Sequence, residues 1–121
     1  MRKEGRERKA AQEVVDRTVR FAPGEEADLK IVRKGGEFLS FGINYRTLLA
    51  GRWHNVIRYD TAHGCVHVHR FWKEGWFEEI EDTGEGDLKK AFDGCFEDVI
   101  ANWSDYKKRM AAALGRRRNG D

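Results

Sequence analysis

The stretch that decides the fold of this chain reads Arg58-Tyr59-Asp60-Thr61-Ala62-His63-Gly64-Cys65-Val66-His67-Val68-His69-Arg70. It predicts two antiparallel β-strands joined by a tight turn, because Gly64 readily takes the positive φ that a two-residue hairpin turn requires. In a strand, side chains two positions apart lie on the same face. Arg58 and Asp60 therefore share a face of the first strand, and His67 and His69 share a face of the second.

The register of this hairpin decides whether the two pairs of side chains meet. A turn at residues 63–64 or 62–63 pairs even-numbered positions with odd-numbered ones, which sets Arg58 and Asp60 opposite the two histidines or next to them. A slip of one residue would put Tyr59 there instead. We expect the even-to-odd register, which gathers an acid, an arginine and two histidines on one face.

Length and composition indicate one domain over residues 1–121, large enough for a single hydrophobic core. The 23 basic residues nearly cancel the 21 acidic ones, so the net charge of +2 does not by itself indicate a nucleic-acid binder. The sequence contains neither a secretory signal nor an apolar run of the roughly 18 residues that a membrane-spanning helix needs. We therefore expect a cytoplasmic protein with no membrane partner.

The hydrophobic pattern divides the chain into three parts. A charged N-terminal helix is expected over residues 3–20, where Ala10, Val14, Val15 and Val19 have helical spacing. Residues 37–80 alternate with period two and are rich in aromatic and β-branched side chains, which predicts an antiparallel meander of about four strands.

A long C-terminal helix should follow the sheet. Asp87 is a good N-cap, the helix is expected over residues 87–114, and a basic tail is expected over residues 115–121. An apolar stripe should pack this helix on one face of the sheet, which gives a two-layer α+β fold. The stripe consists of Leu88, Phe92, Cys95, Phe96, Val99, Trp103, Tyr106 and Met110.

The hairpin carries residue types suited to RNA cleavage without a metal or another cofactor. Attack by a 2′-hydroxyl needs one group that removes a proton and one that protonates the leaving oxygen, and histidine suits both roles near neutral pH. His67 and His69 are the candidate acid and base, and Arg58 is the candidate group that stabilises the phosphate charge. The remaining candidates are Asp60, which would orient a histidine, and the helpers His63 and Tyr45.

Two other functions remain open for the same residues. His67-x-His69, completed by His63 or Asp60, would suit a divalent metal, although this spacing alone is a weak signal. Alternatively, the histidines and Arg58 have only packing and ion-pair roles, and the chain is a non-enzymatic module that binds a protein or a nucleic acid. In that case the basic residues near both ends, including residues 116–118, are the candidate contacts with phosphate.

The run from Arg58 to Gly64, followed by His67-Val68-His69, resembles the signature of the TumE-like toxins of prokaryotic toxin–antitoxin pairs, which have an Arg-aromatic-Asp turn followed by spaced histidines. It also resembles a related group of small uncharacterised prokaryotic proteins that share this hairpin. The resemblance covers about residues 40–75. It departs from the toxin pattern at Gly64, where a second histidine is typical, and the N-terminal segment is not part of the motif.

The resemblance implies a small cytoplasmic α+β protein that acts on RNA. It also implies a cognate antitoxin, a DNA-binding protein from a neighbouring gene, as the partner that neutralises it. A homodimer is a further assembly to be tested.

Overall fold

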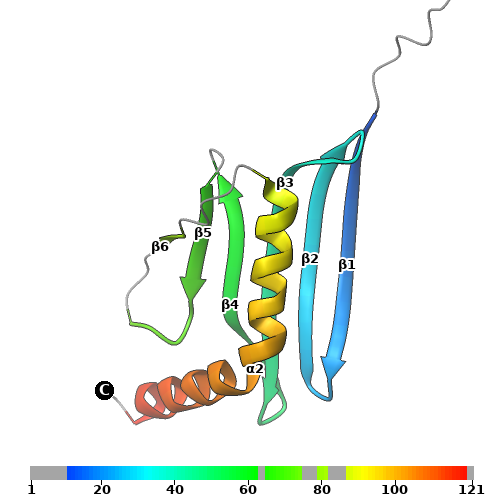
Figure 1. Cartoon of the computed structure of the whole chain (residues 1–121). Coiled ribbons are helices and arrows are strands. Elements are labelled where there is room, and N and C mark those ends of the chain that lie inside the picture. The colour runs from blue at the N-terminus through cyan, green and yellow to red at the C-terminus, as the bar shows by residue number, and fades with distance from the viewer. Residues whose placement is uncertain (1–10, 63–64, 75–78, 82–86, 120–121) are drawn as a thin grey trace, which may run out of the picture.

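The computed structural model describes residues 11–62, 65–74, 79–81 and 87–119, and these form one antiparallel sheet with a single long helix on one face (Figure 1). The sheet order follows the chain, so within the described residues it is a simple meander. Its strands are β1 (Gln12–Ala22), β2 (Glu25–Lys34), β3 (Glu37–Leu49), β4 (Arg52–Ala62), β5 (Cys65–Arg70) and the three-residue β6 (Glu79–Glu81).

The prediction of an N-terminal helix over residues 3–20 is wrong for the described residues from 11 onward, because Gln12–Ala22 forms the edge strand β1. This strand pairs along its length with β2, with Val15 opposite Ile31 and Val19 opposite Ala27. The physical reason is that a spacing of four is shared by both structures. Val15 and Val19 lie on one face of a helix, but they also lie on one face of a strand.

The sheet begins earlier than residue 37 and its middle follows the prediction. Two long strands, β1 and β2, precede the predicted start, and a turn at Gly35 and Gly36, both with positive φ, joins β2 to β3. The three central strands β3, β4 and β5 form the predicted meander. Of the strand expected to end at Ile80, only β6 is described, and residues 75–78 lie outside the described part.

The C-terminal helix, α2, spans Leu88–Arg118 and begins at the predicted cap. The Asp87 carboxylate accepts hydrogen bonds from the backbone N–H groups of Lys89 and Lys90, at 2.9 and 3.4 Å. The helix extends past its predicted end at residue 114, so residues 115–118 are helical rather than part of a tail. Three arginines form the last turn of the helix. Arginine has a high helix propensity, and cations are favourable at the negative end of the helix dipole.

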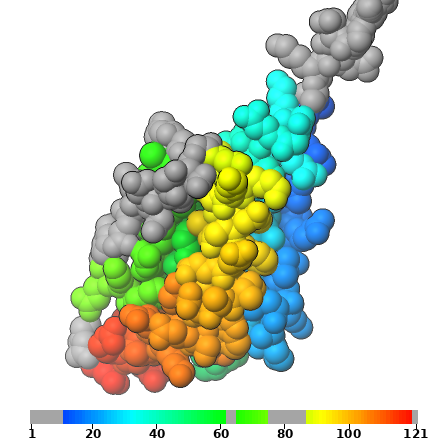
Figure 2. Space-filling model, viewed as in Figure 1, coloured from blue at the N-terminus to red at the C-terminus, as the bar shows by residue number. Residues whose placement is uncertain are grey.

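The core lies between α2 and the sheet face that it covers, and Figure 2 shows the helix side chains lying over the strands. The first half of α2 runs along the middle strands, and its second half turns across one end of the sheet towards β5 (Figure 1). Within the described residues no helix combines the length and the apolar character needed to cross a membrane. The buried side chains that join the two layers include Phe41, Ile43, Tyr45, Ile57, Tyr59, Val66 and Val68 from the sheet and Phe92, Cys95, Val99 and Met110 from the helix.

Candidate functional site: the hairpin of β4 and β5

The hairpin has the predicted even-to-odd register. Arg58 pairs with His69 and Asp60 pairs with His67. The intervening Tyr59 is buried in the core beneath α2, and strand alternation therefore directs its two neighbours to the opposite face. Arg58, Asp60, His67 and His69 thus lie together on the sheet face away from α2, which we call the open face.

The four side chains differ in their access to solvent. His69 is only 3% exposed, whereas His67 is half-buried. The side chains of Arg58 and Asp60 keep 33% and 40% of their surface exposed, and Arg58 Nε lies 3.7 Å from Asp60 Oδ2. An ion pair of this length at a partly exposed site contributes little to stability. A ligand on the open face can therefore contact Arg58, Asp60 and His67 more readily than His69.

Phe71 explains the burial of His69. The two rings are stacked, with centroids 4.0 Å apart and planes 27° apart. The guanidinium carbon of Arg58 lies 5.4 Å from the centre of the same Phe71 ring. The backbone N–H of Phe71 also donates to the carbonyl of Val56, at 3.0 Å. Phe71 therefore packs against both His69 and Arg58.

Tyr45, one of the two predicted helpers, is not brought to this group. Tyr45 points into the core on the other face of the sheet, where its hydroxyl donates to Glu25 Oε1 at 2.5 Å. Burial, and then this hydrogen bond to Glu25, raise the pKa of Tyr45. Phe41, Ile43 and Tyr45 lie two positions apart on β3 and all three are buried, so they share the apolar face of the sheet. His63 lies outside the described residues.

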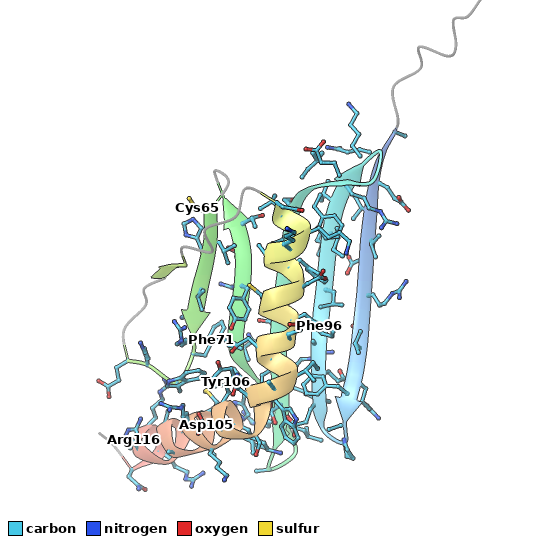
Figure 3. The ribbon with its side chains drawn as sticks, viewed as in Figure 1. Cys65, Phe71, Phe96, Asp105, Tyr106 and Arg116 are labelled. Atoms are coloured by element: carbon cyan, nitrogen blue, oxygen red, sulfur yellow. The ribbon has the colours of Figure 1, made fainter. Side chains whose placement is uncertain are left out.

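Tyr59, at the centre of the Arg-Tyr-Asp motif, anchors the hairpin to α2. Its hydroxyl donates to Asp98 Oδ2, and the same carboxylate accepts from Tyr106 at 2.8 Å and from Asn102 at 2.9 Å. Burial, followed by the Asp98 hydrogen bond, raises the pKa of Tyr59. Tyr106 lies on the second half of α2, near the end of β5 that carries Phe71 (Figure 3). The Arg-Tyr-Asp motif therefore has two roles: Tyr59 binds α2, whereas Arg58 and Asp60 lie on the open face with the histidines.

A second polar cluster on the open face was not predicted from the sequence. Glu26 accepts from Arg46 Nη2 at 2.7 Å and from Arg20 Nη2 at 2.9 Å, and these hydrogen bonds lower its pKa. The Arg46 guanidinium lies 5.1 Å from the centre of the Trp53 ring, which is 42% exposed. A register shift leaves Val56 as an extra residue in β4, and this bulge turns Trp53 to the open face. Without that bulge, alternation would place Trp53 on the face of Tyr59.

The described residues contain no group of three His, Cys, Asp or Glu side chains placed to hold a metal ion. The hairpin thus offers a guanidinium, a carboxylate and a half-buried imidazole on one face, with a second imidazole packed beneath them. Such groups can bind a phosphate and transfer a proton.

Comparison with known proteins gives one match. The family model described as Domain of unknown function (DUF7718) matches residues 7–116, which is nearly the whole chain. No curated protein and no solved structure matches.

Proposed function

We propose that this chain, which belongs to the DUF7718 family of domains of unknown function, cleaves RNA at the open face of the hairpin without a metal ion. The observation that carries the proposal is the pairing of Arg58 with His69 and of Asp60 with His67 on the sheet face that α2 leaves uncovered. Two strands, rather than a loop, hold these groups.

The proposed roles follow from what each side chain can contact. Arg58 binds the phosphate, because a guanidinium donates several hydrogen bonds in one plane to phosphate oxygens. His67 is the more accessible of the two described hairpin histidines and transfers a proton to or from a ribose oxygen. Asp60, directly opposite His67, orients the imidazole.

The second proton transfer is assigned to His69 or to His63. His69 would have to gain access to the RNA, since it is 3% exposed and stacked on Phe71. Removing each histidine separately decides between them. Loss of cleavage in His63→Ala with retention in His69→Phe assigns the role to His63, and the reverse result assigns it to His69.

The direct test is incubation of the purified chain with a mixed set of RNA oligonucleotides in the presence of EDTA. We expect cleavage that yields 2′,3′-cyclic phosphate ends and that falls by about 100-fold or more in His67→Ala and Arg58→Ala. His54→Ala is the matched control, because His54 is a half-buried histidine of β4 outside the hairpin group. Absence of cleavage, or equal cleavage by the His67→Ala variant, would contradict the proposal.

The resemblance to the TumE-like toxins supports a cellular role for this activity. The proposal is that the chain inhibits growth by acting on RNA and that a cognate antitoxin neutralises it. Induced expression in a bacterial host should stop growth, and co-expression of an adjacent gene should restore it. If wild type and His67→Ala stop growth equally, toxicity does not depend on the proposed site.

A second candidate function is a non-enzymatic nucleic-acid-binding module. The Arg46–Trp53 pair favours it, because an exposed aromatic ring beside a guanidinium can stack on an RNA base while the charge contacts a phosphate. Under this function, Trp53→Ala weakens RNA binding about tenfold or more and His67→Ala leaves it unchanged. Fluorescence anisotropy with a labelled single-stranded RNA distinguishes the two candidates.

A further inference from the structure

A cleft lies where the turn between β3 and β4 meets the C-terminal half of α2, away from the hairpin group. Figure 2 shows green atoms of the sheet at the lower edge of the molecule, beneath the orange turns of the helix. The cleft has a volume of about 650 Å³, which is in the range of small-molecule sites. It is lined by Leu49, Ala50, Arg52, His54, Ala111, Leu114, Arg117 and Arg118.

The charged residues of this cleft are all basic. Arg52 comes from the beginning of β4, whereas Arg117 and Arg118 come from the last turn of α2, beside Arg116 (Figure 3). None of the described residues that line the cleft is acidic. Arg117 is fixed in place, because its Nη2 donates to the carbonyl of Phe71 at 2.8 Å. Three arginines from two elements thus line one space.

The helix dipole accounts for only part of this arrangement. Cations in the last turn of a helix are stabilised by the exposed carbonyl groups there, which explains arginines at 116–118 in any protein. It does not explain Arg52, which belongs to a strand. Within the described part of the chain, neither Arg52 nor Arg118 takes part in an ion pair. Both guanidinium groups are available to an anion.

Apart from His54, the rest of the lining is apolar: Leu49 and Ala50 come from the turn between β3 and β4, and Ala111 and Leu114 come from α2. A ligand that fits must therefore combine an anionic group with a flat or apolar body. We propose that this cleft binds a nucleotide, with the phosphate on Arg52 and Arg118 and the base against the apolar side chains of the lining. This site is separate from the proposed RNA-cleaving hairpin and does not depend on it.

Isothermal titration calorimetry with three probes tests the proposal: adenosine monophosphate, adenosine and inorganic phosphate. We expect adenosine monophosphate to bind at least about tenfold more tightly than either of the others, with affinity that decreases as salt increases. Absence of binding would overturn the proposal. So would equal binding of adenosine, which would show that the arginines contribute nothing, or equal binding of phosphate, which would show a simple anion site.

Arginine variants locate the site. Arg52→Gln and Arg118→Gln should each weaken binding of adenosine monophosphate about tenfold or more, because each removes charged hydrogen bonds to the phosphate. Both residues are exposed, so the fold should be retained. Arg109→Gln is the matched control, since Arg109 is an exposed arginine of α2 that pairs with Asp105 outside the cleft.

His67→Ala should bind adenosine monophosphate as wild type does, which separates this test from that of the hairpin. Equal loss of binding in Arg109→Gln, or loss in His67→Ala, would place the nucleotide elsewhere.

Discussion

The two faces of the sheet carry similar charged groups in different surroundings, as the neighbours Glu25 and Glu26 illustrate. Glu25 lies fully buried beneath α2, where it accepts from Tyr45 and from Lys107, the latter at 2.7 Å. Glu26 lies on the open face and accepts from Arg20 and Arg46, which come from the adjacent strands of the sheet. The first carboxylate joins the helix to the sheet, and the second joins strand to strand.

The same division separates the residues of the Arg-Tyr-Asp motif. Tyr59 reaches the helix through Asp98, while Arg58 and Asp60 remain on the open face with the histidines. Polar groups in contact with α2 are therefore structural, whereas on the open face Arg58, Asp60 and His67 keep part of their surface exposed. Substitutions on the two faces should therefore affect different measurements.

The largest expected effect on stability comes from Lys107→Met. This change leaves the buried Glu25 carboxylate without its cation, and we expect a loss of about 3 kcal/mol in the free energy of unfolding. Urea denaturation followed by circular dichroism measures it. Lys108→Met, at an exposed neighbouring position, is the control and should change stability little. Similar stability of the two variants would contradict a structural role for the Glu25–Lys107 pair.

His69 provides the next largest effect and tests whether the open face has a structural residue of its own. His69→Ala removes a buried ring that stacks on Phe71, and we expect a loss of about 2 kcal/mol. His69→Phe keeps a ring in this place and should lose much less. The two unfolding midpoints measure the difference. If both variants are equally destabilised, the stack with Phe71 is not what makes His69 structural.

Tyr59→Phe should have a smaller effect, because the ring stays in the core and Tyr106 and Asn102 still donate to Asp98. We expect a loss of about 1 kcal/mol in stability. RNA cleavage, measured under conditions where the variant is folded, should be unchanged. A large loss of cleavage with normal stability would show that Tyr59 takes part in RNA cleavage and not only in packing.

The smallest expected effect is a loss of folding stability at alkaline pH that depends on Tyr106. Burial and the Asp98 hydrogen bond raise the pKa of Tyr106 to about 12, above the value near 10 of an unfolded tyrosine. The folded protein therefore holds this proton when the unfolded chain has lost it, so the stabilisation is complete below pH 10 and is lost as the pH rises towards 12. Urea midpoints at pH 8, 10 and 11 should decrease less in Tyr106→Phe than in wild type. Parallel decreases would exclude Tyr106 as the cause.

The parts of the fold predicted correctly are those in which short-range pattern and tertiary structure agree. Gly64 and strand alternation favoured the even-to-odd register, which the pairing of β4 with β5 confirms, and Asp87 predicted the start of α2. The prediction of an N-terminal helix was wrong because valines spaced by four residues fit both a helix and a strand. Pairing with β2 makes this segment a strand. The Arg46–Trp53 pair was missed because a bulge changes the alternation within β4.

The sequence by itself determined that Arg58 and Asp60 share a strand face and that His67 and His69 share another, since alternation is a local property of the chain. The sequence favoured the register that brings the two pairs together, and the pairing of β4 with β5 confirms it. It could not determine which face α2 would cover, because both faces carry polar and aromatic residues. Tertiary packing decided that point. Tyr45, Tyr59 and Glu25 face the helix, where their polar atoms find partners at Lys107 and Asp98, and the histidine face is left open. Buried polar groups need such partners, and only the three-dimensional structure supplies them.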